Sequence, residues 1–356
     1  MLATLDHRYT GYQGHIILGV HSNISTREQR YLAAMNVTLY ASDAGPCMSP
    51  LARAGDGLKE GGRAESSSIG GAKYIRGTCS KAYNRLVLES ARYEMALGWL
   101  KACKDCQGWM LVCDVRDTVF QRHPFEDLPR ATPSTTPDLM LFEEAYPPPL
   151  GFDNNHWLAW GTIKNCFGKE HEHEIMKSYR NKAVLCSGST VGTREGLGRY
   201  LAAITRRYYE LTWLGSDCTP PMAVDQPVHN WLFYTAHGYA TDETERAFGG
   251  TPLGEKAVSV PFGSGPVQTV GRLCSMGEKA ELTLGTLSQV NLSVAPATGL
   301  FLNHDGLLAP VVHQHDRCWG IWAKPLQDLC TRAHDHLRPL VEPGAVRNAK
   351  EVCKGG

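Results

Sequence analysis

The sequence has no excess of charge of either sign. Its 36 lysines and arginines balance 36 aspartates and glutamates, and no long basic block occurs. Proteins that bind nucleic acid or an anionic membrane surface need clustered basic side chains to neutralise phosphates. We therefore expect no nucleic-acid partner, and we look for a small or neutral one.

Long apolar runs are also missing. No run approaches the roughly 18 to 20 residues that span a bilayer, and the start "MLATLDHRYTGYQG" lacks the basic residues and apolar stretch of a signal peptide. We expect no membrane span in this chain. A catalytic fragment cut from behind a membrane anchor would show the same absences, so they do not fix the compartment.

The twelve cysteines lack the spacing of a zinc site. Cys103 and Cys106 form a C-x-x-C pair, but a zinc site needs a second Cys/His pair at comparable spacing, and none occurs. The even cysteine count and the glycosylation sequons at Asn23, Asn36 and Asn291 favour a secretory compartment. We expect the Golgi or another secretory lumen, for a fragment without its anchor, and the cytoplasm is the alternative.

What the sequence does contain is an alternation of strand and helix patterns. The chain has 356 residues, of which 42% are hydrophobic, enough for a substantial core, and no internal repeat is visible. Strands are expected at 14–20, 36–43, 109–113, 137–145 and 183–193, and helices at 25–35, 81–102, 194–209 and 224–236. The glycine-rich segment 44–72 predicts a flexible loop. The alternation predicts an α/β fold with a mostly parallel central sheet.

Two acids follow the apolar strand "MLVC", in the stretch "DVRD". In open α/β sheets, ligands bind beyond the carboxyl ends of the strands, where Asp114 and Asp117 are expected. Two neighbouring carboxylates repel each other unless a cation neutralises them, and oxygen ligands suit magnesium or manganese, which would in turn hold a diphosphate. The alternative is local: Asp114 caps the turn, and Asp117 pairs with Arg116 or Arg122. A phosphatase D-x-D-x-T motif is excluded because Arg116 occupies the position of its second acid.

Four segments resemble nucleotide-sugar glycosyltransferases of the GT-A type. "CDVRDTVFQRHPF" resembles the strand that carries the acidic DxD motif, and "CSGSTVGT" resembles a segment that lines the sugar pocket. "DQPVHN" resembles the start of the following helix, and "VHQHDR" resembles the late segment with a histidine that closes the metal site. The segments occur in the family's order between about residues 15 and 317, but the acidic motif has two residues between its acids where the family has one.

This resemblance implies one GT-A-like, Rossmann-like domain over residues 1–356. Its nucleotide-binding part would cover 14–125, its sugar and acceptor part 137–317, and a tail 318–356. The implied reaction moves a sugar from a nucleoside-diphosphate sugar to a hydroxyl group of a glycan, glycoprotein or glycolipid. A divalent metal ion, Mn²⁺ or Mg²⁺, would assist it. We expect the acceptor to approach over 145–172.

The resemblance and the chemistry of the side chains together assign roles. The metal ligands are expected to be Asp117 first, Asp114 second and His313 third. The candidates for the base that deprotonates the acceptor are Asp225, Glu144 and Glu143. The residues expected to contact the nucleotide sugar are His21, Ser22, Arg92, Arg116, Ser187, Gly188, Ser189, Gln226 and Asn230.

Two other functions compete with a glycosyltransferase. The first is a binding module that recognises a glycan or a nucleotide sugar without turnover. The second is a sugar nucleotidyltransferase, which shares the sheet and the metal chemistry. The latter needs a glycine-rich, basic phosphate loop just after the first strand, and "GVHSNISTRE" supplies little of it.

Overall fold

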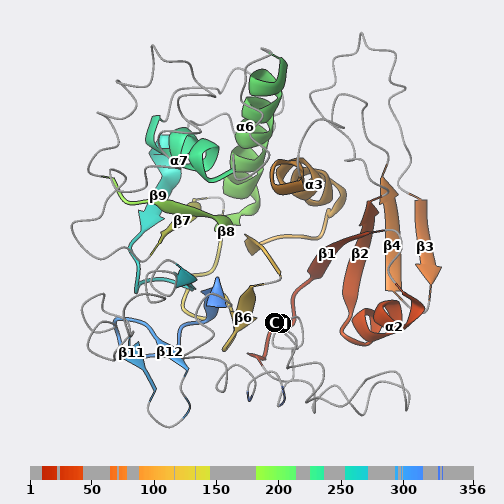
Figure 1. Ribbon diagram of the computed structural model, residues 1–356, viewed down its shortest axis with the longest axis horizontal. Coiled ribbons are helices and arrows are strands. Elements are labelled where there is room, and N and C mark those ends of the chain that lie inside the picture. Colours follow the sequence, from red (N-terminus) through yellow and green to blue (C-terminus); the bar gives the residue numbers. More distant parts are fainter. Residues whose placement is uncertain are drawn as a thin grey trace, which may run out of the picture.

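The computed structural model describes most of the segments in which secondary structure is expected. These are residues 10–21, 25–42, 65–69, 72–77, 88–115, 117–132, 134–144, 182–213, 225–235, 253–271, 293–295, 298, 300–315, 328 and 331. Within them the fold is mixed α/β, with several sheets (Figure 1). The predicted α/β class is therefore confirmed.

The N-terminal sheet begins with a βαβ unit, as predicted. Its strands β1 (Ile16–His21) and β2 (Val37–Ser42) are parallel and are connected through α2 (Thr26–Ala34). The sheet continues with β4 (Ala72–Gly77) and the antiparallel β3 (Glu65–Ile69), in the order β1-β2-β4-β3. The loop predicted at 44–72 is thus wrong for 65–69 and for Ala72, and its residues 44–64, 70 and 71 lie outside the described part. The sequence "ESSSI" has little apolar patterning, so it gives no signal of a strand. Its backbone nevertheless pairs with β4.

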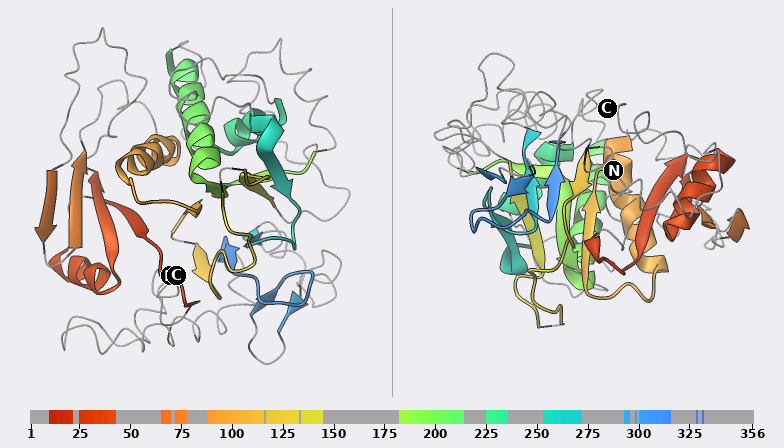
Figure 2. Two further views of the ribbon diagram at one scale, coloured as in Figure 1. Left: turned by 180° about the vertical axis from the view of Figure 1, so that it is seen from behind. Right: turned by 90° about the horizontal axis from the view of Figure 1, so that it is seen from below.

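A second sheet has the order β5-β8-β7-β9. Its strands are β5 (Trp109–Cys113), β8 (Leu185–Thr193), β7 (Leu139–Glu143) and β9 (Ala257–Val260). One face is covered by α3 (Leu88–Ala102), α6 (Arg194–Trp213) and α7 (Asp225–Thr235), and the short α9 (Leu253–Lys256) precedes β9 (Figure 1). Views from behind and below place the N-terminal sheet on one side of α3, and α6 on its other side (Figure 2).

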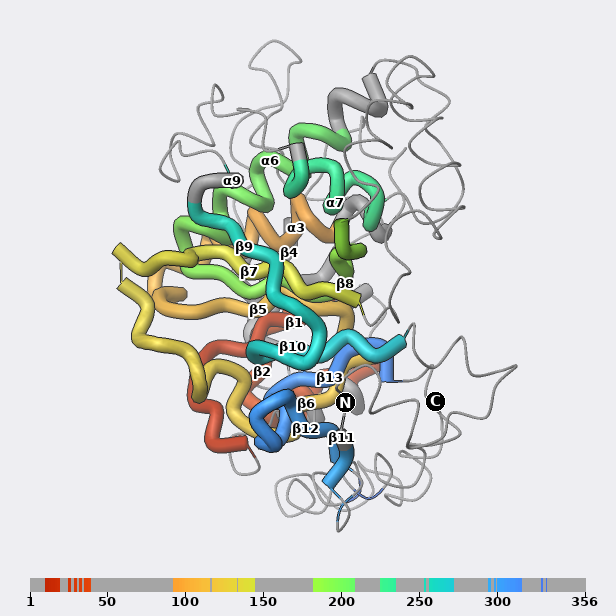
Figure 3. The backbone as a smooth tube through the Cα atoms, turned by 90° about the vertical axis from the view of Figure 1, so that its left-hand side faces the viewer, coloured from red at the N-terminus to blue at the C-terminus, as the bar shows by residue number. Residues whose placement is uncertain are grey.

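Strand β7, one of the two inner strands of the second sheet, is buried on both faces. Leu139 and Leu141 of β7 pack against the helices, whereas Met140 and Phe142 pack on the opposite face. There they meet a small third sheet, β10-β13-β6, built from β10 (Val267–Thr269), β13 (Val311–His313) and β6 (Thr118–Phe120) (Figure 3). A hairpin of β11 (Ser293–Val294) and β12 (Phe301–Leu302) lies near β6 and β13.

The prediction of a mostly parallel central sheet is wrong. Among the described strands, four pairs are parallel and five are antiparallel. Strand β5 pairs antiparallel with β8 and belongs to a different sheet from β1. An apolar run such as "WMLVC" indicates a strand but contains no information on the direction of its partner.

The helices agree with the sequence in position. The expected helices at 25–35, 194–209 and 224–236 correspond to α2, α6 and α7, and α3 covers the described part of the helix expected at 81–102. None of the helices in the described part of the chain combines the length and the apolar character that a bilayer crossing requires.

Candidate metal centre

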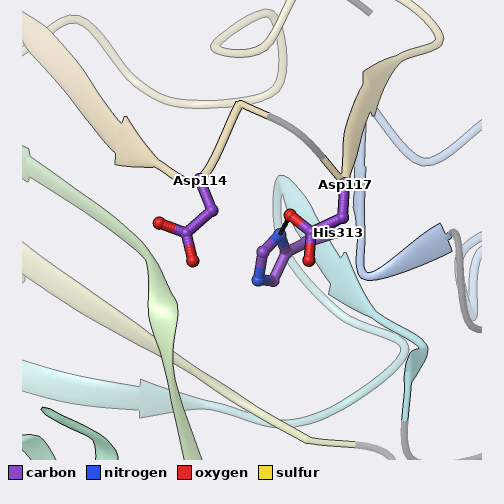
Figure 4. Close-up of side chains that lie close together, drawn as sticks. All are labelled: Asp114, Asp117 and His313. Atoms are coloured by element: carbon purple, nitrogen blue, oxygen red, sulfur yellow. Dashed lines mark ion pairs between the residues drawn. The ribbon is translucent and has the colours of Figure 1, made fainter. Parts of the chain in front are cut away.

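Three predicted metal ligands meet where the second and third sheets adjoin. Asp114 follows the end of β5, Asp117 immediately precedes β6, and His313 is the last residue of β13. The antiparallel pairing of β6 with β13 sets His313 opposite Thr118, next to Asp117. One ligand atom of each residue lies within 4.8 Å of the others, and the imidazole lies between the two carboxylates in the view of Figure 4.

The hydrogen bonds of Thr118 determine which nitrogen of His313 can bind a metal ion. The Thr118 hydroxyl donates its single proton to the backbone oxygen of Asp114 at 2.5 Å, and it lies 3.0 Å from Nδ1 of His313. Since that proton is already used, Nδ1–H must be the donor in the second contact. Oδ1 of Asp117 lies 3.4 Å from the same nitrogen. With a proton on Nδ1, a neutral imidazole would present the lone pair of Nε2, as a metal ligand requires.

Gly188 of β8 makes room for this nitrogen. A Cβ atom at position 188 would lie 2.2 Å from Nε2 of His313 and 3.0 Å from Oδ2 of Asp114. The backbone oxygen of Gly188 also accepts a hydrogen bond of 2.9 Å from the amide of Asp114. Glycine at this position therefore lets the backbone approach two of the candidate ligands, and its expected contact with the nucleotide sugar stays a prediction.

Arg92 of α3 connects the cluster to a third acid. Its Nη1 pairs with Oδ1 of Asp114, and its Nη2 donates to Oδ2 of Asp225 at 2.7 Å and to the backbone oxygen of Ser187 at 3.0 Å. Burial opposes the charged guanidinium, but Tyr93, Asp114 and Asp225 together raise the pKa of Arg92 well above its ordinary value. Arg92 was expected to contact the nucleotide, and the described contacts are instead to two acids of the site.

Asp225 begins α7 and is largely enclosed. Its Oδ2 accepts hydrogen bonds from Arg92 and from the hydroxyl of Ser187, the latter at 2.8 Å. Burial raises the pKa of Asp225, and the charge of Arg92 and the Ser187 hydrogen bond act in the opposite direction. The structure therefore brings Asp225 and Ser187 together with Arg92 beside the metal cluster.

Gln226 and Asn230 also lie on α7, and both contact β8. The Gln226 amide donates to Oε1 of Glu144 at 2.7 Å and to the backbone oxygen of Leu185 at 3.2 Å. Asn230 accepts from the amide of Leu185 and donates to its oxygen, both at 2.8 Å, so its side chain clamps the strand. The register between β7 and β8 shifts next to this clamp, because Leu141 pairs with Thr190 whereas Glu143 pairs with Leu185.

The two adjacent glutamates at the end of β7, Glu143 as its last residue and Glu144 just beyond it, have different surroundings, as expected from strand alternation. Glu144 is buried and accepts from Gln226. Glu143 is half-buried, and its pKa is raised by burial, with a hydrogen bond from Ser259 of β9 acting against the rise. Among the two, Glu144 is the one connected to α7 and its site residues.

Among the buried polar atoms without a hydrogen-bond partner in the described part of the chain, three lie next to cluster residues in sequence or strand register: Oγ of Ser189, Oγ1 of Thr269 and Oε1 of Gln314. Ser189 and Gln314 are sequence neighbours of Gly188 and His313, and Thr269 pairs with His313 across β10 and β13. Buried polar atoms of this kind are uncommon, and they often mark the surroundings of an ion or a ligand. Their position next to the cluster agrees with a polar binding site there.

The remaining predicted residues are not positioned as side chains. Ser22, Arg116 and the acceptor segment 145–172 lie outside the described residues, and of His21 the structure describes only the backbone, which pairs with Ser42. Sequence reasoning missed Thr118 and Tyr93. Thr118 was detectable as a polar residue at the start of an apolar strand next to two acids. Tyr93 offered no signal, although its hydroxyl contacts Arg92 at 3.1 Å.

The chain matches no protein-family model, no curated protein and no solved structure. Its chemistry therefore has to be argued from the cluster itself. Two carboxylates and one imidazole form a mixed oxygen and nitrogen donor set. Carboxylates suit Mg²⁺ and Mn²⁺, and an imidazole ligand favours the transition metals, so Mn²⁺ is one of the ions compatible with the whole set.

Proposed function

We propose that the chain is a metal-dependent glycosyltransferase of the GT-A type. It would transfer a sugar from a nucleoside-diphosphate sugar to a hydroxyl group of a carbohydrate or glycoconjugate. The observation that supports this most is the cluster of Asp114, Asp117 and His313, which are separated by up to 199 residues and offer ligand atoms within 4.8 Å of one another.

The arrangement of the four family-like segments gives further support. Gly188, from "CSGS", lies against Asp114 and His313, which come from "DVRD" and "VHQHDR". Asp225, from "DQPVHN", is joined to Asp114 through Arg92. Chance matches to a family pattern would have no reason to meet in one place, and these four do.

Each side chain has a defined task in this proposal. A divalent ion, when bound, stabilises the negative charge that develops on the diphosphate leaving group. Asp114, Asp117 and Nε2 of His313 hold that ion, and Thr118 fixes the tautomer of the imidazole. Gly188 keeps the space in front of Nε2 free of a side chain.

Deprotonation of the acceptor hydroxyl is assigned to Asp225 first and to Glu144 second. Burial raises the pKa of Asp225, which strengthens it as a base, and Arg92 connects it to Asp114. Glu144 is buried just after the end of β7, and a hydrogen bond from Gln226 connects it to α7, the helix that Asp225 begins. Glu143, on the other side of β7, is the third choice.

The first experiment is a thermal-shift screen of nucleoside-diphosphate sugars with the full chain, with and without Mn²⁺. The proposal expects stabilisation by one donor that depends on the metal, and release of the nucleoside diphosphate when an acceptor is added. Donor binding without turnover would support the binding module. Release of pyrophosphate from a nucleoside triphosphate and a sugar phosphate would support the nucleotidyltransferase. No metal-dependent shift with any donor would refute the proposal.

The second experiment replaces a ligand charge without changing side-chain size. Asp117→Asn should lower metal-dependent turnover about 100-fold or more while the fold persists, because the centre loses a carboxylate. Asp127→Asn is the matched control, since Asp127 pairs with Arg122 at the exposed surface. Full activity in Asp117→Asn would refute the assignment of this residue to the metal centre.

A further inference from the structure

Arg92 makes more contacts than a surface ion pair requires. Its guanidinium contacts the carboxylates of Asp114 and Asp225, the backbone oxygen of Ser187 and the hydroxyl of Tyr93. The side chain is only 20% exposed. The four partners lie after β5, in α3, in β8 and in α7, so together they fix both the position and the plane of the guanidinium.

The two oxygens of Asp114 face different partners. Oδ1 pairs with Arg92, whereas Oδ2 lies 3.0 Å from the point that a Cβ on Gly188 would occupy. Nε2 of His313 lies 2.2 Å from the same point. Oδ2 and Nε2 therefore face one region, and the pairing of Oδ1 with Arg92 sets the rotation of the carboxylate that brings Oδ2 there.

We infer that Arg92 is a positioning residue of the metal centre, which holds the carboxylate of Asp114 so that Oδ2 faces His313 and the bound ion. The inference rests on the proposed metal centre and adds a residue that acts through a ligand. The expected contact of Arg92 with the nucleotide sugar stays a separate prediction. Hydrogen-bonding partners that orient metal ligands change metal affinity or activity about 10- to 100-fold when they are removed.

The same contacts connect the metal centre to the candidate base. Burial is the main cause of the raised pKa of Asp225; the charge of Arg92 lowers this pKa, and repulsion from the charge of Asp114 adds a smaller rise. A guanidinium between the two carboxylates compensates this repulsion and keeps both acids near each other. Arg92 therefore sets the separation between the ion and the base as well as the orientation of Asp114.

A competing role for Arg92 predicts the opposite result. A guanidinium next to a metal ligand can act as a substitute cation that the ion has to displace, and then its removal would strengthen metal binding. The geometry favours positioning, because Arg92 occupies Oδ1 and leaves Oδ2 directed toward His313. The sign of the change in metal affinity therefore distinguishes the two roles.

The test is a titration of the full chain with Mn²⁺, in which free Mn²⁺ is measured by electron paramagnetic resonance. Arg92→Met should weaken Mn²⁺ binding about 10- to 100-fold, and Arg92→Lys, which keeps the charge, should weaken it less. Arg122→Met is the matched control, because Arg122 is 18% exposed and also pairs with two acids, Glu126 and Asp127, outside the cluster. This control should bind Mn²⁺ within about twofold of the wild type, because neither of its acidic partners belongs to the metal cluster.

Unchanged or tighter Mn²⁺ binding in folded Arg92→Met would overturn the inference and leave the metal centre in place. Absence of Mn²⁺ binding in the wild type would instead refute the proposed metal centre itself. Circular dichroism and thermal unfolding identify variants that do not fold. If Arg92→Met is among them, Arg92→Lys decides by sign, because the weaker pairing of a lysine predicts a loss under positioning and a gain under competition.

Discussion

Substitution of Gly188 by alanine tests the centre with the smallest chemical change available. The added methyl carbon would lie 2.2 Å from Nε2 of His313 and 3.0 Å from Oδ2 of Asp114. A contact of 2.2 Å does not occur between real carbon and nitrogen atoms that are not bonded, so a side chain must move by about 1 Å to reach ordinary van der Waals separation. The imidazole is the group that moves, because the nearest atoms belong to its side chain and not to backbone.

The size of the effect follows from what the displacement disrupts. Nε2 is the ligand atom, and its orientation depends on the contact of Nδ1 with Thr118. A displacement of about 1 Å in a catalytic geometry costs about 100-fold, and a comparable loss of affinity corresponds to about 2.8 kcal/mol. We therefore expect Gly188→Ala to weaken Mn²⁺ binding about 100-fold while thermal stability changes little.

The matched control is Gly192→Ala on the same strand. There the added carbon would meet the backbone oxygen of Asp138 and the amide of Leu197, both at 3.1 Å, away from the metal cluster. This variant should lose stability and keep its Mn²⁺ affinity per folded molecule, as measured by thermal unfolding and Mn²⁺ titration. Wild-type Mn²⁺ affinity in Gly188→Ala would refute the argument that this glycine makes room for His313.

Two further predictions concern buried groups away from the cluster. Burial lowers the pKa of His229 from 6.5 to about 3, so below pH 6.5 the unfolded chain binds a proton that the folded chain does not. This group's contribution to the free energy of unfolding therefore falls by about 1.4 kcal/mol per pH unit as the pH drops from about 6 to 4. His229→Asn should remove that part of the slope in urea unfolding, and an unchanged slope would contradict the assignment. Arg199 donates to both oxygens of Asp138 at 2.7 Å in the core, so Asp138→Asn should cost about 3 to 5 kcal/mol of unfolding free energy; a loss below about 1 kcal/mol would contradict this.

Local patterns predicted the elements well because their causes are local. The apolar runs at β5 and β7 and the helical spacing of α6 are properties of neighbouring residues, and each element was placed within a few residues. The direction in which two strands pair does not have a local cause of this kind. Strand β5 is equally apolar whether its neighbour runs parallel or antiparallel, so its antiparallel pairing with β8 could not be read from "WMLVC".

The residues of the candidate site also differ in how far local sequence could predict them. Asp114 and Asp117 were detectable because two acids follow an apolar strand, a local pattern with a chemical meaning. His313 lies almost two hundred residues away, and only the family resemblance proposed it; the register of β6 against β13 is what brings it to Thr118. The contacts of Arg92 depend on how α3 packs beside β8, which no spacing in the helix reveals.

The grouping of acids gives a further reason to expect a cation. Asp114, Asp117 and Asp225, when ionised, bring three negative charges into one region, and Arg92, which pairs with Asp114 and Asp225, brings one positive charge. Like charges that lie close together repel one another unless a positive charge is near them, and a divalent ion held by Asp114, Asp117 and His313 would add to the positive charge that Arg92 supplies.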